Sequence, residues 1–142
     1  MTNNAREARM GITLDQAESV VLAGRAEADS IGVPMNIAVV DAGNNLTAFA
    51  RQDGAWLGSI DIAQNKAYTA RAFDSATGDL YDETQPGGSL YGLSASNDGH
   101  VITFPGGIPL KDGETIVGAV GVSGGTVDQD QQVAEAAVKG LS

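Results

Sequence analysis

The 142-residue sequence contains no cysteine and only one histidine, His100. Without cysteine, the chain can form neither a disulfide nor a thiolate metal site, and it has no cysteine nucleophile. One histidine is too few for a histidine-rich metal site, and the spacing of an EF-hand is not present, so we predict no metal centre. The lack of cysteine also agrees with a cytoplasmic location, which we expect.

Basic residues and long apolar runs are scarce as well. Eight lysines and arginines stand against 18 aspartates and glutamates, and the formal net charge is −10. Because the basic residues form no stripe, neither nucleic acid nor a membrane surface is an expected partner. No stretch approaches the roughly 20 consecutive apolar residues of a membrane span. Residues 1–11 are polar, do not resemble a signal peptide and are predicted to be a flexible tail, and residues 12–142 to form a single domain.

Capping signals and apolar residues at helical spacing predict the helices. Thr13 and Gln16 have the spacing of a capping box, and Thr126 and Gln129 repeat it near the C-terminus. Gly32, followed by a proline two positions later, predicts the end of the first helix. The expected helices cover residues 13–31, 59–73 and 76–84 and the segment that begins at residue 126.

The remaining segments indicate an antiparallel sheet. Strands are expected over residues 35–41, 46–51, 90–93, 101–104, 108–110 and 115–122. Turn residues at 42–45 and the Asp112-Gly113 pair join neighbouring strands as hairpins. Residues 115–122 are almost all apolar, so this strand should be central and covered on both faces. Since helices do not alternate with strands, the predicted fold class is α+β.

The segment VITFPGGIPL, residues 101–110, is the most informative part of the chain. Proline removes a backbone donor, and glycine adopts conformations that other residues avoid. Two prolines and a glycine pair between apolar residues therefore indicate a loop shaped around a ligand. The predicted ligand-binding residues of this region are Tyr91, Phe104, Pro105, Gly106, Gly107, Ile108 and Pro109.

Four polar residues are further candidates for ligand binding. His100 is either a turn residue or a group suited to metal coordination or to proton transfer. Lys66 has no carboxylate one helical turn away, so it either reaches solvent or points toward a pocket, where it could pair with a ligand carboxylate. Asp41 is expected to hydrogen-bond its turn. Arg51 either pairs with Asp53 or clamps a carboxylate.

Four ordered blocks resemble the family of GlcG/HbpS-type proteins, which includes the C-terminal domain of PduO. These blocks are AVVDAG at 38–43, AQNKAYTA at 63–70, GGIPL at 106–110 and GAVGVSG at 118–124. The resemblance extends over nearly the whole chain, from Ile12 to Leu141. It implies a profilin-like antiparallel five-stranded sheet flanked by helices, assembled into homo-oligomers from dimer to octamer.

The same resemblance implies binding of a small planar or anionic ligand, with haem as the expected cofactor. Relatives often carry a histidine where this chain has Asn45. The leading hypothesis is a small-ligand-binding accessory protein of a catabolic or sensing pathway. The alternative is a cofactor-independent enzyme that acts on a small organic acid, with Lys66 or His100 as general acid or base. A purely structural assembly subunit is a third interpretation.

Overall fold

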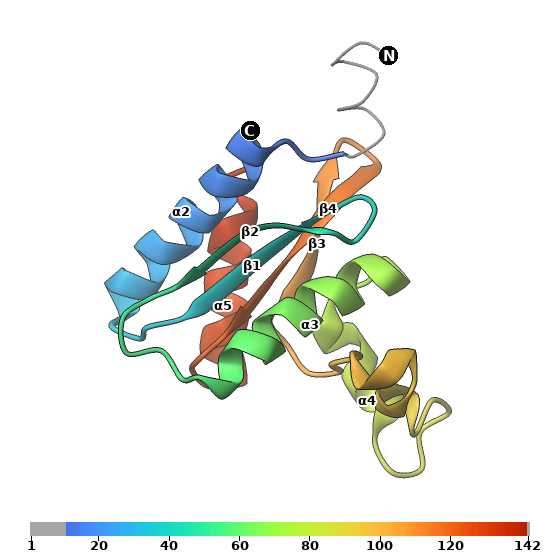
Figure 1. Ribbon diagram of the computed structural model, residues 1–142. Helices are drawn as coiled ribbons and strands as arrows, with labels where there is room; N and C mark the ends of the chain where they lie inside the picture. The colour runs from blue at the N-terminus through green and yellow to red at the C-terminus, as the bar shows by residue number, and fades with distance from the viewer. Residues whose placement is uncertain (1–10, 142) are drawn as a thin grey trace.

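The computed structural model describes residues 11–141, so residues 1–10 of the predicted tail lie outside the described part of the chain. Helices cover both faces of one sheet, with α2 and α5 on one face and α3 on the other (Figure 1). The α+β class is therefore confirmed. In chain order the elements are α2 (Leu14–Ile31), β1 (Asn36–Asp41), β2 (Leu46–Arg51), α3 (Gly58–Phe73), α4 (Tyr81–Thr84), β3 (Gly107–Asp112), β4 (Thr115–Ser123) and α5 (Val127–Val138).

The sheet has four strands in the order β2-β1-β4-β3, and all neighbouring strands are antiparallel. β4 is central, as predicted for residues 115–122. The prediction of five strands is wrong, because residues 11–141 contribute only four to this sheet. The larger aliphatic core lies between the sheet and the α2/α5 layer, and it includes Val20, Ile37, Leu110, Val122 and Val133.

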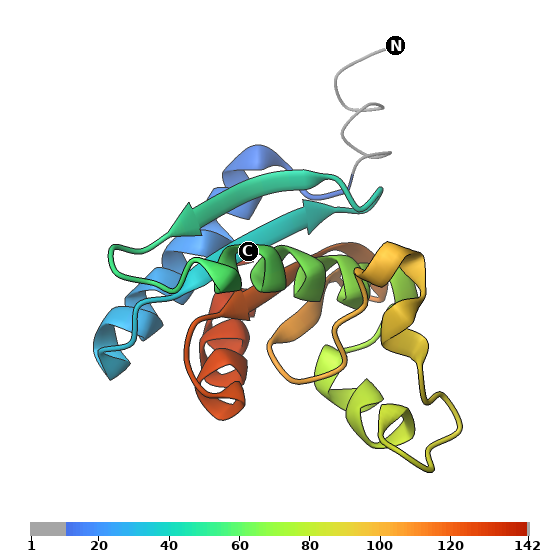
Figure 2. The same ribbon diagram turned by 60° about the horizontal axis from the view of Figure 1, so that its bottom comes forward.

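Residues 90–93 and 101–104, two of the six segments expected as strands, are not strands, which leaves the four that form the sheet. Gly92 has a φ of 94°, and a 3₁₀ helix over Leu93–Ala95 follows it. In the second segment, the Ile102 N–H donates to the hydroxyl of Thr69 on α3, so the chain is tied to a helix instead of a strand. Apolar periodicity predicted extended backbone here but could not identify its partner. Figure 2 shows the connection from α3 to β3 standing away from the sheet.

Both predicted capping boxes are present. The Thr13 hydroxyl accepts from the Gln16 N–H at 3.1 Å, and the Gln16 side chain accepts from the Thr13 N–H at 3.0 Å. Thr126 and its partner three residues later repeat this arrangement at α5. Helix α2 ends at Gly32 with a φ of 71°, a left-handed conformation that glycine adopts without a Cβ penalty. The positions of these helix ends are therefore set by interactions between residues that are close together in the sequence.

Helix α3 lies very close to β4 because small residues line the contact. Ala63, Ala67 and Ala70 are buried in this layer. A Cβ on Gly121 would lie 2.0 Å from the Ala63 carbonyl oxygen, so the approach requires glycine. The same contact places Lys66 directly against the sheet.

Candidate functional site

The predicted Pro-Gly-Gly loop is held by contacts from three elements. The Gly106 N–H donates to the side chain of Gln131 on α5 at 3.1 Å. The Gly107 N–H donates to the hydroxyl of Thr77 at 2.9 Å. A Cβ on Gly106 would lie 2.6 Å from Lys66 Nζ, and a Cβ on Gly107 would lie 2.5 Å from the Lys66 carbonyl oxygen. The glycine pair therefore lets the loop rest directly on α3.

Lys66 is fully buried beneath this loop. Its Nζ donates to Asp130 Oδ2 at 2.8 Å and to the Val122 carbonyl at 2.8 Å, and it lies 5.0 Å from the centroid of the Phe104 ring. The other carboxylate oxygen of Asp130 accepts from the Gly125 N–H at 2.9 Å. Of the two alternatives for Lys66, exposure to solvent is wrong, because its side chain is 0% exposed. Its charge is balanced inside the protein, so no ligand carboxylate is needed for this purpose.

Burial controls the protonation of this ion pair. Desolvation lowers the pKa of Lys66 and raises the pKa of Asp130, and the attraction between the two charges opposes both shifts. A buried ion pair of this kind adds little net stability, but each charge is strongly penalised if its partner is lost. The pair therefore fixes how α3, β4 and α5 meet beneath the loop.

An apolar hollow of about 510 Å³ lies beside the loop. This volume is within the range of small-molecule sites. Tyr81 and Val127 are 46% and 42% exposed, so part of the apolar lining is open to a ligand. The hollow is lined by Gly78, Tyr81, Asp82, Phe104, Pro105 and Val127.

His100 is exposed and is oriented by residues of α3. Its Nδ1 lies 3.2 Å from Asn65 Oδ1, and its ring centroid lies 5.8 Å from that of Tyr68. In the tautomer that carries its proton on Nδ1, this nitrogen donates to the Asn65 amide oxygen, which only accepts hydrogen bonds. In that tautomer Nε2 has a lone pair, and within residues 11–141 this nitrogen has no hydrogen-bond partner. An imidazole held through one nitrogen in this way can coordinate a metal through the other.

Asp41 and Arg51 lie at opposite ends of the β1–β2 pair. Asp41 Oδ1 accepts from the backbone N–H of Asn45 at 3.0 Å, which confirms its predicted role in the turn. Arg51 donates to the Ala55 carbonyl at 3.2 Å, and the structure shows no ion pair between Arg51 and Asp53. These two candidates therefore do not belong to one site.

The remaining predicted residues differ in their placement. Phe104 and Pro105 line the apolar hollow. Ile108 and Pro109 belong to strand β3. Tyr91 is 68% exposed and does not line the hollow. Ligand contact by any of these residues stays a prediction.

Sequence reasoning did not identify Asp130 as the partner of Lys66. A signal was nevertheless present, because Asp130 shares one helical face with the core residues Val133 and Ala137. Lys66 likewise interrupts the apolar stripe of α3. A single acid and a single base on two buried stripes indicate a buried pair, since an unpaired buried charge is very costly.

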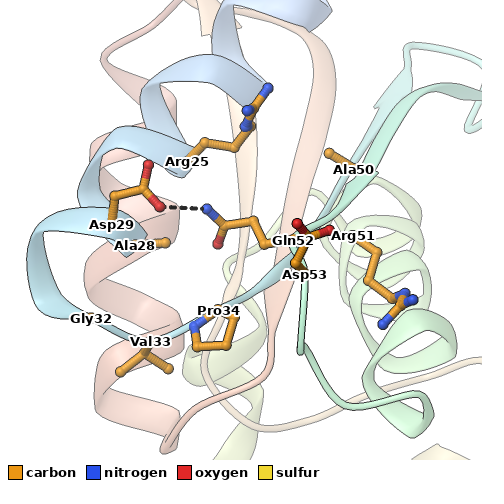
Figure 3. A pocket seen from close by; sticks show the side chains of 10 residues that line it. All are labelled: Arg25, Ala28, Asp29, Gly32, Val33, Pro34, Ala50, Arg51, Gln52 and Asp53. Atoms are coloured by element: carbon orange, nitrogen blue, oxygen red, sulfur yellow. Dashed lines mark hydrogen bonds between the residues drawn. The ribbon is translucent and has the colours of Figure 1, made fainter.

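A second cleft, of about 590 Å³, lies at the opposite edge of the sheet, between the end of α2 and β2 (Figure 3). Gln52 crosses it, donating to Asp29 Oδ1 at 3.0 Å and accepting from the Met35 N–H at 2.8 Å. Figure 3 shows that Arg51 turns away from Arg25. The polar groups in the middle of this cleft are thus already paired with one another.

Residues 11–141 contain neither a membrane-spanning helix nor a cluster of metal ligands. No helix in this range combines the length and apolar character needed to cross a membrane. No three side chains of histidine, cysteine, aspartate or glutamate in the same range cluster as metal ligands do.

The fold and these sites define an α+β protein with a rigid glycine loop, an adjoining apolar hollow and one accessible imidazole. The family model described as "Haem degrading protein HbpS-like" matches residues 12–139. The chain therefore belongs to the HbpS-like family, as the four sequence blocks predicted.

Individual comparisons agree with this assignment. The chain is 45% identical, over 89% of both chains, to an uncharacterized 15.0 kDa protein from the dhaT-dhaS intergenic region of Citrobacter freundii. It is similar to the crystal structure of a PduOC:haem complex, with 35% identity and a TM-score of 0.89 over 93% of this chain and 96% of that one. A double mutant of HbpS from Streptomyces reticuli is 28% identical, with a TM-score of 0.83 over 93% of this chain and 88% of that one.

Proposed function

We propose that this protein binds a small planar ligand, with haem as that ligand, and that it serves as an accessory protein in a catabolic or sensing pathway. The observation that carries this proposal is the state of His100. Its imidazole is exposed, its Nδ1 is held by Asn65, and its Nε2 is available. Support also comes from the family description and from the haem complex of a relative with the same fold.

The residues present fit haem in two respects. His100 supplies an imidazole nitrogen, which is a common axial ligand of haem iron. Phe104 and Pro105, at the end of the segment that follows His100, supply apolar surface against which a macrocycle can pack. When bound, haem supplies redox chemistry, and the protein binds and orients it. Because the protein has a net charge of −10, repulsion should direct the negatively charged propionate groups of haem toward solvent.

The catalytic alternative is not supported. Lys66 is fully buried, and its ammonium group already donates to Asp130 and Val122. A general acid or base must reach the substrate within hydrogen-bond distance. Lys66 cannot do so while the loop covers it, and the comparisons give no reaction of this kind.

A hemin titration followed by Soret absorbance tests the proposal. We expect a saturable, shifted Soret band for the wild-type protein and at least a tenfold loss of affinity in His100→Ala. Lys111→Met is a suitable control, because it changes an exposed side chain outside the candidate residues and leaves the imidazole unchanged.

Two results would contradict parts of this assignment. A Soret band that is unchanged in His100→Ala would rule out His100 as the axial ligand, and Tyr81→Phe would then test the exposed phenol of the hollow. A wild-type protein without a saturable Soret shift would rule out haem binding.

We also propose that the chain forms a homo-oligomer, from dimer to octamer. Both outer strands of the sheet, β2 and β3, have one unpaired edge within the described chain. Such edges are available for contacts with other chains. Several large apolar side chains near β2 are more than half exposed, namely Leu14, Leu22 and Leu46.

A further inference from the structure

One polar stripe of α3 faces the segment that carries His100. Asp61, Asn65 and Thr69 are spaced four residues apart, so they lie on one face of this helix. Thr69 is completely buried, and its hydroxyl accepts from the Ile102 N–H at 2.9 Å and lies 3.3 Å from the His100 carbonyl oxygen. These contacts hold the backbone of the segment against the helix, so the imidazole starts from a fixed position.

The imidazole ring of His100 is held by two side chains of the same helix. Nδ1 lies 3.2 Å from Asn65 Oδ1, and the ring is tilted by 58° against the ring of Tyr68, with 5.8 Å between the centroids. The Tyr68 hydroxyl donates to Asn97 Oδ1 at 2.8 Å, in the turn just before His100. Of the two ring nitrogens, only Nδ1 has a hydrogen-bond partner within residues 11–141.

The direction of the hydrogen bond between Asn65 and His100 depends on Asp61. An asparagine side chain has an accepting oxygen on one side and a donating NH₂ group on the other, so its orientation decides which atom faces the imidazole. Asn65 Nδ2 donates to Asp61 Oδ2 at 3.0 Å. An ionised carboxylate only accepts, so a reversed amide would bring two accepting oxygens together at this contact. Asp61 therefore favours the orientation in which Asn65 Oδ1 faces His100.

We propose that Asp61 is a positioning residue that acts through the Asn65 amide and keeps the imidazole proton of His100 on Nδ1. Nε2 then has the lone pair and is the nitrogen that coordinates an iron. With the amide reversed, Nδ1 would accept from Asn65 and the proton would be on Nε2. A group behind a ligand histidine can fix its tautomer in this way. The inference rests on the proposed function where it names haem iron, whereas the tautomer is a property of the protein without haem.

Nitrogen NMR of the His100 ring tests this proposal on the full chain without haem. A long-range proton–nitrogen correlation spectrum, recorded at a pH that keeps imidazole neutral, distinguishes the protonated ring nitrogen from the unprotonated one. His100 is the only histidine, so a protein without a histidine tag gives one set of ring signals. We expect a protonated Nδ1 and an unprotonated Nε2. Free histidine in water favours the opposite tautomer, so an unconstrained ring would not give this result.

Asp61→Asn should lower the Nδ1–H population to about one half or less, because an amide at this position donates as well as accepts and no longer selects one orientation of Asn65. Asp15→Asn is the matched control, since Asp15 also lies in the first turn of a helix, and it should leave the tautomer unchanged. The double variant Asp61→Asn/Asn65→Asp places the carboxylate next to the imidazole and should restore the proton on Nδ1. A merely structural role of Asp61 would not give this recovery.

A hemin titration of the same variants connects the tautomer to the proposed function. Asp61→Asn should weaken hemin binding at least twofold, because affinity falls with the fraction of the competent form. A wild-type ring with its proton on Nε2 would overturn the proposal. So would a tautomer that is unchanged in Asp61→Asn or equally changed in Asp15→Asn. The expected tautomers without any Soret shift would instead refute haem binding, so failures of the two proposals are distinguishable.

Discussion

Lys66 and Asp130 form an ion pair in a part of the protein that water does not reach. Nζ has two oxygen partners at 2.8 Å and the Phe104 ring beside it, so the ammonium group is well surrounded. The pair fixes how α3, β4 and α5 meet and adds little net stability, because the attraction between the charges mainly offsets the cost of their desolvation. Removing either residue is therefore costly mainly because it leaves the charge of the other buried without a partner.

Lys66→Met should lower the free energy of unfolding by about 3–5 kcal/mol, since it leaves Asp130 buried without its partner. The double variant Lys66→Met/Asp130→Leu should recover most of this loss. Urea unfolding measures both values, and Lys111→Met, at an exposed lysine, should change stability by no more than about 0.5 kcal/mol. A double variant that is less stable than Lys66→Met would contradict this account.

At the scale of elements, the contact between α3 and β4 determines where the candidate residues lie. Gly121 lets the helix approach the strand, and Lys66 then reaches past β4 to α5. The loop before β3 rests on Lys66 for the same reason. A small change in the spacing of these two elements would consequently displace the loop and the wall of the hollow.

Gly121→Ala should lower the free energy of unfolding by about 3 kcal/mol, because the new methyl group overlaps the backbone of α3 and not a flexible side chain. Gly58→Ala is a matched control. A Cβ there meets no atom within 4 Å, and the residue begins a helix, so stability should change by less than about 1 kcal/mol. Chemical denaturation compares the two variants, and similar losses would show that close packing is not the cause.

At the scale of the whole molecule, the net charge opposes association between copies of the chain, whereas the open strand edges favour it. A net charge of −10 makes copies of the chain repel one another. The free edges of β2 and β3 and the exposed leucines near β2 favour association. Salt screens the repulsion and has little effect on the apolar contacts.

Size-exclusion chromatography with light scattering should therefore give a mass that is a multiple of the 14.5 kDa chain, from two to eight copies. Raising the salt concentration should stabilise the assembly against dilution, since it reduces repulsion between the acidic chains. A monomer at every salt and protein concentration tested would refute the proposed oligomer.

Much of the candidate site lay beyond prediction because its contacts join distant residues. The glycine loop and His100 were identified from local residue patterns, and Asp41 forms the turn expected of it. The sequence could not show that Asn65 orients His100, 35 positions away.

Features that depend on neighbouring residues could be predicted from the chain alone. The capping boxes at Thr13 and Thr126, the end of α2 at Gly32 and the Asp112-Gly113 turn involve groups only a few positions apart. Tertiary packing set the number of strands and the partner of Lys66, which lies 64 positions away. The reason is that a local pattern specifies the conformation of a segment, whereas its partner depends on how all the layers pack together.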